Sequence, residues 1–381
     1  MNTPKIRFNE FEGEWKTFSI TDIALLKAGK SFNKNDVIEE SGTGYYPCYG
    51  GNGHRGFLPY YNQEGKYNII GRQGALCGCI NVAEGKFYAT EHAVLVTPII
   101  ETDFSFLHES LVRANINQFA TGAAQPGISV ANVNDQLSLV MPSLNEQKFV
   151  GKYFTHLDFL IFSFTSRLAS LKRVKEASLQ AMFPQEGETV PKIRFKGFDG
   201  EWKKVKLGEI FIERTENDIN GEMLSVTMHD GIIKASENGR FDNSNSDKSN
   251  YKLVLENDIA YNSMRMWQGA SGCSPYRGIV SPAYTVITPN EGVDSKFFAF
   301  YFKTNEIIKK FRLHSQGLTK DTWNLKYSAF SKIQILYPHN ELEQQKIASY
   351  FTSLDRRISL QTQRLEKLKQ IKAACLDKMF V

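Results

Sequence analysis

The chain repeats its own sequence, and this duplication constrains the fold more than any other feature. Residues 4–15 return as residues 191–202 with nine of twelve positions identical. Residues 153–158 return as residues 350–355, and this second match runs without a gap to Met182-Phe183 and Met379-Phe380. Between the repeated parts the sequence diverges. Two copies with divergent interiors predict one scaffold that presents two different surfaces.

Size and composition limit the class of protein. A chain of 381 residues exceeds what one hydrophobic core usually supports, so two or more domains are expected. The sequence has no apolar run of about 18 residues and no apolar leader, which predicts neither a membrane span nor a signal peptide. The five cysteines do not form spaced pairs, which fits a cytoplasmic protein. The net charge of +5 favours an anionic partner only modestly.

The repeated segments 142–186 and 338–381 are predicted to be long helices. Each opens with proline followed by Glu- and Gln-rich sequence, which suits a helix N-terminus. Apolar residues then recur at steps of three, four and seven, the spacing of a coiled-coil seam. Roughly 40 residues would span about 60 Å, and so long a helix with one apolar stripe needs a partner. The simplest partner is the other copy, which gives an antiparallel coiled coil.

The two predicted helices differ on one face, where a partner could dock. The first carries Phe159 and Phe162 where the second carries Arg356 and Ser359. We expect the extra apolar face to meet either a globular domain of this chain or a separate protein. The basic residues of the helices are either a solvated face or a contact with DNA or another subunit. The candidate docking residues are Phe159, Phe162, Arg356 and Arg357.

The divergent segments are predicted to form two β-rich domains, within residues 1–141 and 187–337. Short apolar runs separated by glycine-rich turns indicate strands, and one amphipathic helix is expected in each domain, at residues 104–118 and 295–314. Faint echoes indicate a shared fold: residues 96–98 resemble 287–289, Gly122 resembles Gly317, and the run after Arg72 resembles the run after Arg265. The predicted fold class is therefore α+β, with two domains in pseudo-two-fold symmetry separated by the paired helices.

Mixed aromatic, amide and basic side chains mark the loops of both domains. Such mixtures suit contacts to base edges and phosphates, although tyrosine and glycine are also common in irregular β domains. The candidate DNA-binding residues are Tyr49, Asn52, His54, Arg55, Arg72 and Gln73 in the first domain, and Arg265, Trp267, Gln268, Arg277 and Lys320 in the second.

The sequence carries no recognisable catalytic or metal-binding motif. Gly29-Lys30-Ser31 resembles the end of a P-loop, but Ala24 stands where that motif needs its first glycine. The seven histidines are scattered, and Cys77-Gly-Cys79 has no second cluster with which to bind a metal. The sequence therefore indicates a binding protein rather than an enzyme.

The motifs resemble those of one family over the whole chain. The openings at residues 4–15 and 191–202, the helix starts at 142–147 and 342–347, and their repeated order are similar to specificity subunits of Type I restriction–modification enzymes. The resemblance implies that each divergent segment is a target-recognition domain that reads one half of an asymmetric, bipartite DNA site. It implies that the helices set the spacer between the halves and dock the partner subunits.

The resemblance also implies which partners and cofactors take part. Two methyltransferase subunits and two restriction subunits would join this chain on double-stranded DNA. S-adenosylmethionine, ATP and Mg²⁺ would bind those subunits, and this chain would bind no cofactor or metal. The alternatives are a duplicated non-enzymatic scaffold that binds protein or carbohydrate, and an enzyme whose site has no recognisable motif.

Overall fold

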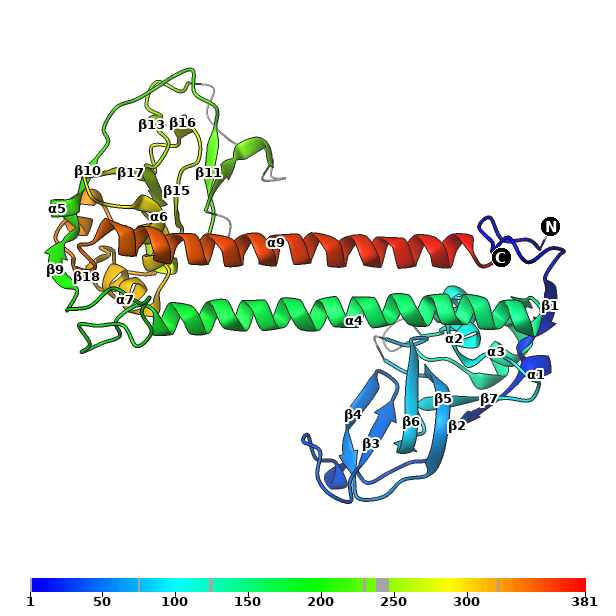
Figure 1. The fold of residues 1–381 in the computed structure, drawn as a ribbon. Coiled ribbons are helices and arrows are strands. Elements are labelled where there is room, and N and C mark those ends of the chain that lie inside the picture. The colour runs from blue at the N-terminus through cyan, green and yellow to red at the C-terminus, as the bar shows by residue number, and fades with distance from the viewer. Residues whose placement is uncertain (1, 75, 123–125, 229–230, 238–246, 321) are drawn as a thin grey trace. The chain divides into compact units, whose positions relative to one another are not determined.

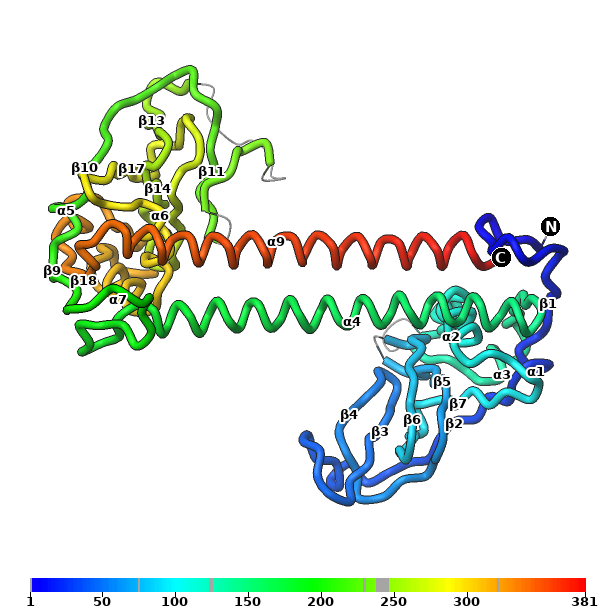
Figure 2. The backbone as a smooth tube through the Cα atoms, in the orientation of Figure 1, coloured from blue at the N-terminus to red at the C-terminus, as the bar shows by residue number. Residues whose placement is uncertain are grey.

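The computed structural model describes residues 2–74, 76–122, 126–228, 231–237, 247–320 and 322–381. The chain divides into two compact units. Unit 1 contains residues 1–166 and 363–381, and unit 2 contains residues 167–362. Each unit holds one β-rich globular part and a stretch of both long helices, which Figures 1 and 2 trace along the chain.

Unit 1 is built on a six-stranded sheet in the order β2-β7-β5-β6-β3-β4. These strands are β2 (Ala24–Ala28), β3 (Tyr46–Gly50), β4 (Gly53–Leu58), β5 (Gln63–Gly71), β6 (Ile80–Ala89) and β7 (Ala93–Pro98). A separate antiparallel pair joins β1 (Lys16–Ser19) to β8 (Ser138–Met141). The helices are α1 (Ile20–Ile23), α2 (Phe104–Arg113) and α3 (Val130–Gln136), with 3₁₀ turns η1 (Lys34–Asp36) and η2 (Ile116–Phe119). Figure 1 shows α2 beside the long helix α4.

Unit 2 has shorter strands. Its four-stranded sheet has the order β10 (Phe211–Glu213), β17 (Tyr284–Pro289), β14 (Ile259–Asn262) and β15 (Ser271–Cys273). Three strand pairs complete it: β9 (Lys203–Lys206) with β18 (Gln334–Tyr337), β11 (Leu224–Val226) with β12 (Ile232–Lys234), and β13 (Lys252–Val254) with β16 (Gly278–Val280). The helices are α5 (Leu207–Ile210), α6 (Ser295–Tyr301), α7 (Asn305–His314) and α8 (Tyr327–Phe330), with 3₁₀ turns η3 (Ala235–Glu237) and η4 (Met266–Gln268).

The strand registers confirm that the two units share one fold. The first strand of unit 1 pairs Lys16 with Met141, and its counterpart in unit 2 pairs Lys203 with Tyr337. The next strand pairs Ala24 with Pro98 in unit 1 and Phe211 with Pro289 in unit 2. The first two strands begin at residues 16 and 24 in unit 1 and at residues 203 and 211 in unit 2, the same spacing, and the partner strands β7 and β17 both end at a proline. The echo between residues 96–98 and 287–289 therefore marks equivalent positions.

The two long helices are α4 (Leu144–Ala181) and α9 (Glu341–Lys378), each of 38 residues. Within unit 1 they are linked by Lys372, whose Nζ lies 2.7 Å from Oδ1 of Asp158. The equivalent pair in unit 2 joins Lys175 to Asp355. In each unit the residue numbers rise along one helix as they fall along the other. The predicted antiparallel coiled coil is confirmed.

The repeated Met-Phe at the end of each helix packs into a hydrophobic core. Phe183, just after the end of α4, is fully buried in unit 2 and stacks on Tyr301 with ring centroids 4.9 Å apart. Phe380, after the end of α9, stacks on Phe106 of unit 1 at 5.2 Å and lies 6.2 Å from Trp15. These aromatic contacts anchor each helix end to the unit in which it finishes.

In each unit the repeated opening segment contacts the start of a repeated long helix, which explains why the two sequences occur together. Arg7, in the first opening segment, donates two hydrogen bonds of 2.7 and 2.8 Å to the buried carboxylate of Glu146 at the start of α4. Arg194 makes the same pair of bonds to the buried carboxylate of Glu343 at the start of α9. A bidentate, buried pair fixes both distance and orientation, so each opening segment is held on one helix start.

Both predicted amphipathic helices were wrong in length. The first ends at Arg113, because Asn115 takes a left-handed conformation with φ of 48° before the short turn η2. The second is two helices: α6 ends at Tyr301, and α7 begins after Thr304, whose extended backbone forms a new N-cap. Among the described residues no helix is long and apolar enough to cross a bilayer. All five cysteines are free thiols.

Candidate nucleic-acid interface

In unit 1 two loops that are far apart in the sequence abut each other. The β3–β4 turn and the segment after β5 come so close that a β-carbon at Gly51 would lie 2.3 Å from the carbonyl oxygen of Gln73. The backbone N–H of Leu76 donates to Oδ1 of Asn52 at 3.4 Å. The structure therefore brings the predicted residues Asn52 and Gln73 to one place, and glycine is required at position 51 for this approach.

The other predicted residues of the β3–β4 hairpin play different parts. Tyr49 packs on Phe87 at 5.7 Å, and burial raises the pKa of its hydroxyl, so it is chiefly a packing residue. His54 is exposed and lies edge-on to Tyr49 at 5.8 Å. Arg55 is exposed, and its guanidinium lies 5.4 Å from the ring centre of Phe32. His54 and Arg55 are thus available to a ligand.

Arg72 supports its own loop. Its Nε donates at 3.0 Å to the carbonyl oxygen of Ile128, and its own carbonyl accepts from the N–H of Ile128 at 2.8 Å. In unit 2 the equivalent hydrogen bond runs from the N–H of Leu325 to the carbonyl oxygen of Ser263. By this backbone pairing, Arg72 of unit 1 is equivalent in position to Ser263 of unit 2. The sequence echo had aligned Arg72 with Arg265 instead. The echo between Gly122 and Gly317 does hold. Gly122 follows Thr121, which is bridged to Gly127, and Gly317 follows Gln316, which is bridged to Asn324.

In unit 2 the turn η4 presents Arg265 and Gln268 to solvent, while Met266 between them is fully buried. Trp267 is half-buried, and its Nε1 donates to the carbonyl oxygen of Met264 at 3.1 Å. Neither Arg265 nor Gln268 has a side-chain hydrogen bond to any described residue. Three of the predicted residues thus lie in one short turn, and two of them have polar groups that remain available.

Sequence reasoning missed two residues beside this turn. Trp323 packs edge-on against Trp267 with ring centroids 5.3 Å apart, and Arg312 of α7 lies 5.7 Å from the ring centre of Trp323. Trp323 is one of only four tryptophans in the chain, and two of the others lie in the repeated openings. This rarity is the signal by which the sequence could have indicated Trp323 as a functional residue. Lys320 is exposed in the segment that leads to Trp323.

Arg277 belongs to a different part of unit 2. Its guanidinium forms an exposed ion pair with Asp218, at 3.3 Å. Arg277 directly precedes β16, whereas Asp218 lies between β10 and β11, so the pair belongs neither to η4 nor to the segment around Trp323. The structure therefore does not join Arg277 to the group formed by Arg265, Trp267 and Gln268 through any contact among the described residues.

The candidate docking residues on the helices are exposed. Phe159 and Phe162 of α4 are 64% and 70% exposed, which is unusual for phenylalanine. Arg356 and Arg357 of α9 are also exposed. Phe159 and Phe162 lie in unit 1, whereas the arginines lie in unit 2. Within unit 1 the two phenylalanines remain available for a partner.

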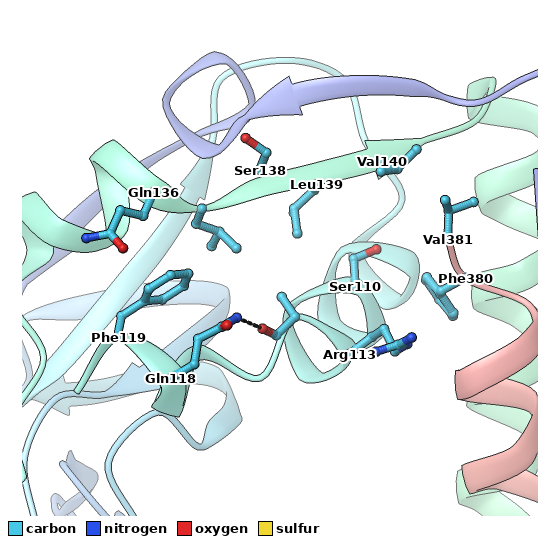
Figure 3. Close-up of a pocket in the computed structure, with 12 residues that line it drawn as sticks. Ser110, Arg113, Gln118, Phe119, Gln136, Ser138, Leu139, Val140, Phe380 and Val381 are labelled. Atoms are coloured by element: carbon cyan, nitrogen blue, oxygen red, sulfur yellow. Dashed lines mark hydrogen bonds between the residues drawn. The ribbon is translucent and has the colours of Figure 1, made fainter. Parts of the chain in front are cut away.

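Unit 1 also contains a cavity of about 400 Å³, shown in Figure 3. It lies between the end of α2, the strand β8 and the residues after α9. Its lining residues are Ser110, Arg113, Ala114, Gln118, Phe119, Gln136, Leu137, Ser138, Leu139, Val140, Phe380 and Val381. None of the candidate DNA-binding residues lines it. The described parts of the chain contain no group of three or more His, Cys, Asp or Glu side chains placed to hold a metal ion.

The fold and the exposed loops define a duplicated recognition scaffold. The family described as Type I restriction modification DNA specificity domain matches residues 12–173 and 199–370. The chain belongs to this family and contains two of its DNA-recognition domains. The family assignment favours DNA over the protein or carbohydrate ligands of the alternative hypothesis.

Individual proteins show the same likeness. The Type I restriction enzyme EcoprrI specificity subunit of Escherichia coli is 37% identical over 175 residues, 45% of this chain and 42% of the relative. The matched part is thus less than half the length of that curated protein. The crystal structure of a Type I restriction–modification S subunit from M. genitalium has a TM-score of 0.70 at 17% identity and covers 100% of this chain and 99% of its own. An HsdS subunit from Thermoanaerobacter tengcongensis has a TM-score of 0.43 at 13% identity and covers 96% of both chains.

Proposed function

We propose that each unit reads one half of an asymmetric, bipartite site in duplex DNA. The observation that carries this proposal is the contrast between shared scaffold and divergent surface. Both units repeat the same strand registers, yet the segment after β5 in unit 1 and the segment after β14 in unit 2 expose different side chains. Different side chains on one scaffold would read different base sequences, which makes the site asymmetric.

The candidate contacts divide by chemistry. Exposed cations such as Arg55 and Lys320 suit phosphates, which position a protein on the duplex without reading its sequence. Side chains with amide or guanidinium groups on rigid turns, such as Gln73, Arg265 and Gln268, suit base edges in the major groove. Binding should weaken steeply with salt, because phosphate contacts release counterions from DNA.

The long helices would set the unread spacer between the two half-sites. Each is a continuous helix of 38 residues, or about 57 Å at about 1.5 Å per residue. A spacer of fixed length lets two modest recognition domains bind one duplex together, which raises affinity through effective concentration. Inserting four residues near Ser170 should lengthen the spacer or abolish activity, and unchanged spacing in methylation mapping would contradict this role.

Catalysis would belong to partner subunits of the Type I system. The relatives are specificity subunits, and we propose that two methyltransferase subunits and two restriction subunits assemble with this chain and carry S-adenosylmethionine, ATP and Mg²⁺. The exposed Phe159 and Phe162 on α4 support a docking role for the helix. Replacing both with alanine should weaken co-purification of the methyltransferase subunit without unfolding the chain.

Exchange of one recognition segment tests the proposed function. The chain would be co-expressed with its methyltransferase subunits after residues 203–337 are replaced by the corresponding segment of another specificity chain. Methylation mapping should show that one half of the site changes while the other half and the spacer stay the same. The reciprocal exchange of residues 16–141 should change the other half. A change in the whole site, or in neither half, would contradict the assignment of one half-site to each unit.

A further inference from the structure

We propose that the turn η4 reads two specific bases, with Arg265 bound to a guanine and Gln268 to an adenine in the half-site of unit 2. This inference rests on the proposed function, and it assigns a base to each side chain. Arginine pairs bidentately with O6 and N7 of guanine, and glutamine pairs with N6 and N7 of adenine, both from the major groove.

The geometry of the turn places the two side chains together. A 3₁₀ turn has three residues per turn, so side chains three positions apart eclipse each other. Arg265 is the N-cap of η4 and Gln268 is its last residue, three positions later. Met266 is fully buried and fixes the opposite side of the turn in the core. Arg265 itself has a non-helical backbone (φ −125°, ψ 8°), but both side chains are exposed and three positions apart, a spacing that suits base pairs that are neighbours or next neighbours.

The turn is held rigidly by its own hydrogen bonds. The N–H groups of Arg265 and Gln268 donate at 2.9 Å to the carbonyls of Asn262 and Arg265 respectively, and Gly269 closes the turn in a left-handed conformation with φ of 81°. The carbonyl of Ser263 accepts from Leu325 at 2.8 Å, which ties the turn to a second segment. A preordered backbone reduces the entropy lost on binding, which suits a base-reading element.

The surroundings separate base reading from phosphate binding. Arg312 and Lys320 are exposed cations on neighbouring segments, and Trp323 packs between Arg312 and Trp267. These cations can bind phosphates beside the turn. Gln268 is uncharged, and its exposed amide, which has no partner among the described residues, carries both a donor and an acceptor, as the edge of adenine does. An arginine and an amide side by side match a guanine and an adenine better than two phosphates.

The inference also distinguishes Arg265 from Arg72. Both follow corresponding strands, but Nε of Arg72 is already bound to the carbonyl of Ile128, and Arg72 is half-buried. Arg265 is exposed and has no such bond to the described residues. One donor of the Arg72 guanidinium is thus committed to its own backbone, whereas Arg265 has no hydrogen bond to a described residue and can offer its whole fork to a guanine.

The test measures base preference at each position of the site. The full chain, assembled with its co-expressed methyltransferase subunits, would select duplexes from a randomised DNA library, and the parent would be compared with Arg265→Ala, Arg265→Lys and Gln268→Ala. Arg265→Ala should lower the preference for one G·C pair by about 5- to 150-fold and leave the other positions unchanged. Arg265→Lys should weaken the same preference and keep the affinity of the complex for unrelated DNA, because lysine retains the charge but not the planar fork.

Gln268→Ala should lower the preference for one A·T pair within two positions of that G·C pair. The exposed Gln180 of α4 provides a matched control, since Gln180→Ala should change no position. Melting temperatures within a few degrees of the parent would show that each variant is folded. The inference is overturned if Arg265→Ala weakens all sequences equally, leaves every preference intact, or relaxes a base other than guanine. It is also overturned if Gln268→Ala leaves adenine preference unchanged. A parent complex with no sequence preference would instead refute the proposed function.

Discussion

Replacing Phe183 with alanine should destabilise unit 2 and leave unit 1 intact. Phe183 is fully buried just after the end of α4. Its ring lies 4.9 Å from Tyr301, 5.5 Å from Phe297, 5.9 Å from Phe351 and 6.0 Å from Trp202. The substitution removes all four ring contacts and leaves a cavity, because the surrounding side chains come from different elements and relax only partly.

The expected cost follows from this packing. Buried Phe→Ala substitutions cost about 3–5 kcal/mol, and each aromatic pair adds about 0.5–1.5 kcal/mol beyond area burial. With four aromatic neighbours, Phe183→Ala should lie at the upper end, near 4–5 kcal/mol. That is a large part of the stability of a typical domain. Phe162→Ala is the matched control: its ring is 70% exposed, so the cost should stay within about 0.5 kcal/mol.

Hydrogen exchange followed by mass spectrometry measures the loss in each unit separately. Peptides from β14 and β17 report on unit 2, and peptides from β5 and β7 report on unit 1. Phe183→Ala should accelerate exchange in the unit 2 peptides, and the equivalent Phe380→Ala should do so in the unit 1 peptides. Equal acceleration in both units, or a Phe162→Ala variant as unstable as Phe183→Ala, would refute the reasoning.

Two further predictions concern unit 1. Gly51→Ala should cost about 1–3 kcal/mol of stability, because its β-carbon would lie 2.3 Å from the backbone of Gln73. The control Gly42→Ala should cost less than about 0.5 kcal/mol, because its β-carbon would make only ordinary contact. Thermal unfolding of both variants measures these costs, and equal costs would contradict the prediction. Burial raises the pKa of the Glu109 carboxyl despite its contact with Lys372. The stability that Glu109 contributes is therefore fully present below the unfolded pKa of about 4.3 and is lost as pH rises through the folded pKa. Glu109→Gln removes this loss, because glutamine does not titrate. In urea unfolding, the free energy of unfolding of the variant should rise relative to that of the parent between pH 4 and pH 7. The same difference at both pH values would contradict this prediction.

The sequence by itself determined the duplicated plan. The repeated openings and helices predicted two equivalent domains, and the structure places Lys16 and Lys203 in equivalent strand registers. The heptad-like spacing predicted two paired helices, because an apolar stripe of that length must be covered. The repeated Phe183 and Phe380 were visible as part of that pattern. These features could be predicted because they depend on periodicity and repetition, which sequence carries directly.

Other features were decided only by tertiary structure. Phe298 and Phe302 near the end of α6 are buried in the core of unit 2, and α7 begins only after the extended Thr304, although the amphipathic pattern continues across this break. The different states of Arg72 and Arg265 depend on whether a carbonyl from another segment, that of Ile128, lies within reach. The pairing of Trp323 with Trp267 joins residues 56 positions apart. Local sequence reports which side chains are available, but contacts between distant segments decide which remain free to bind a ligand.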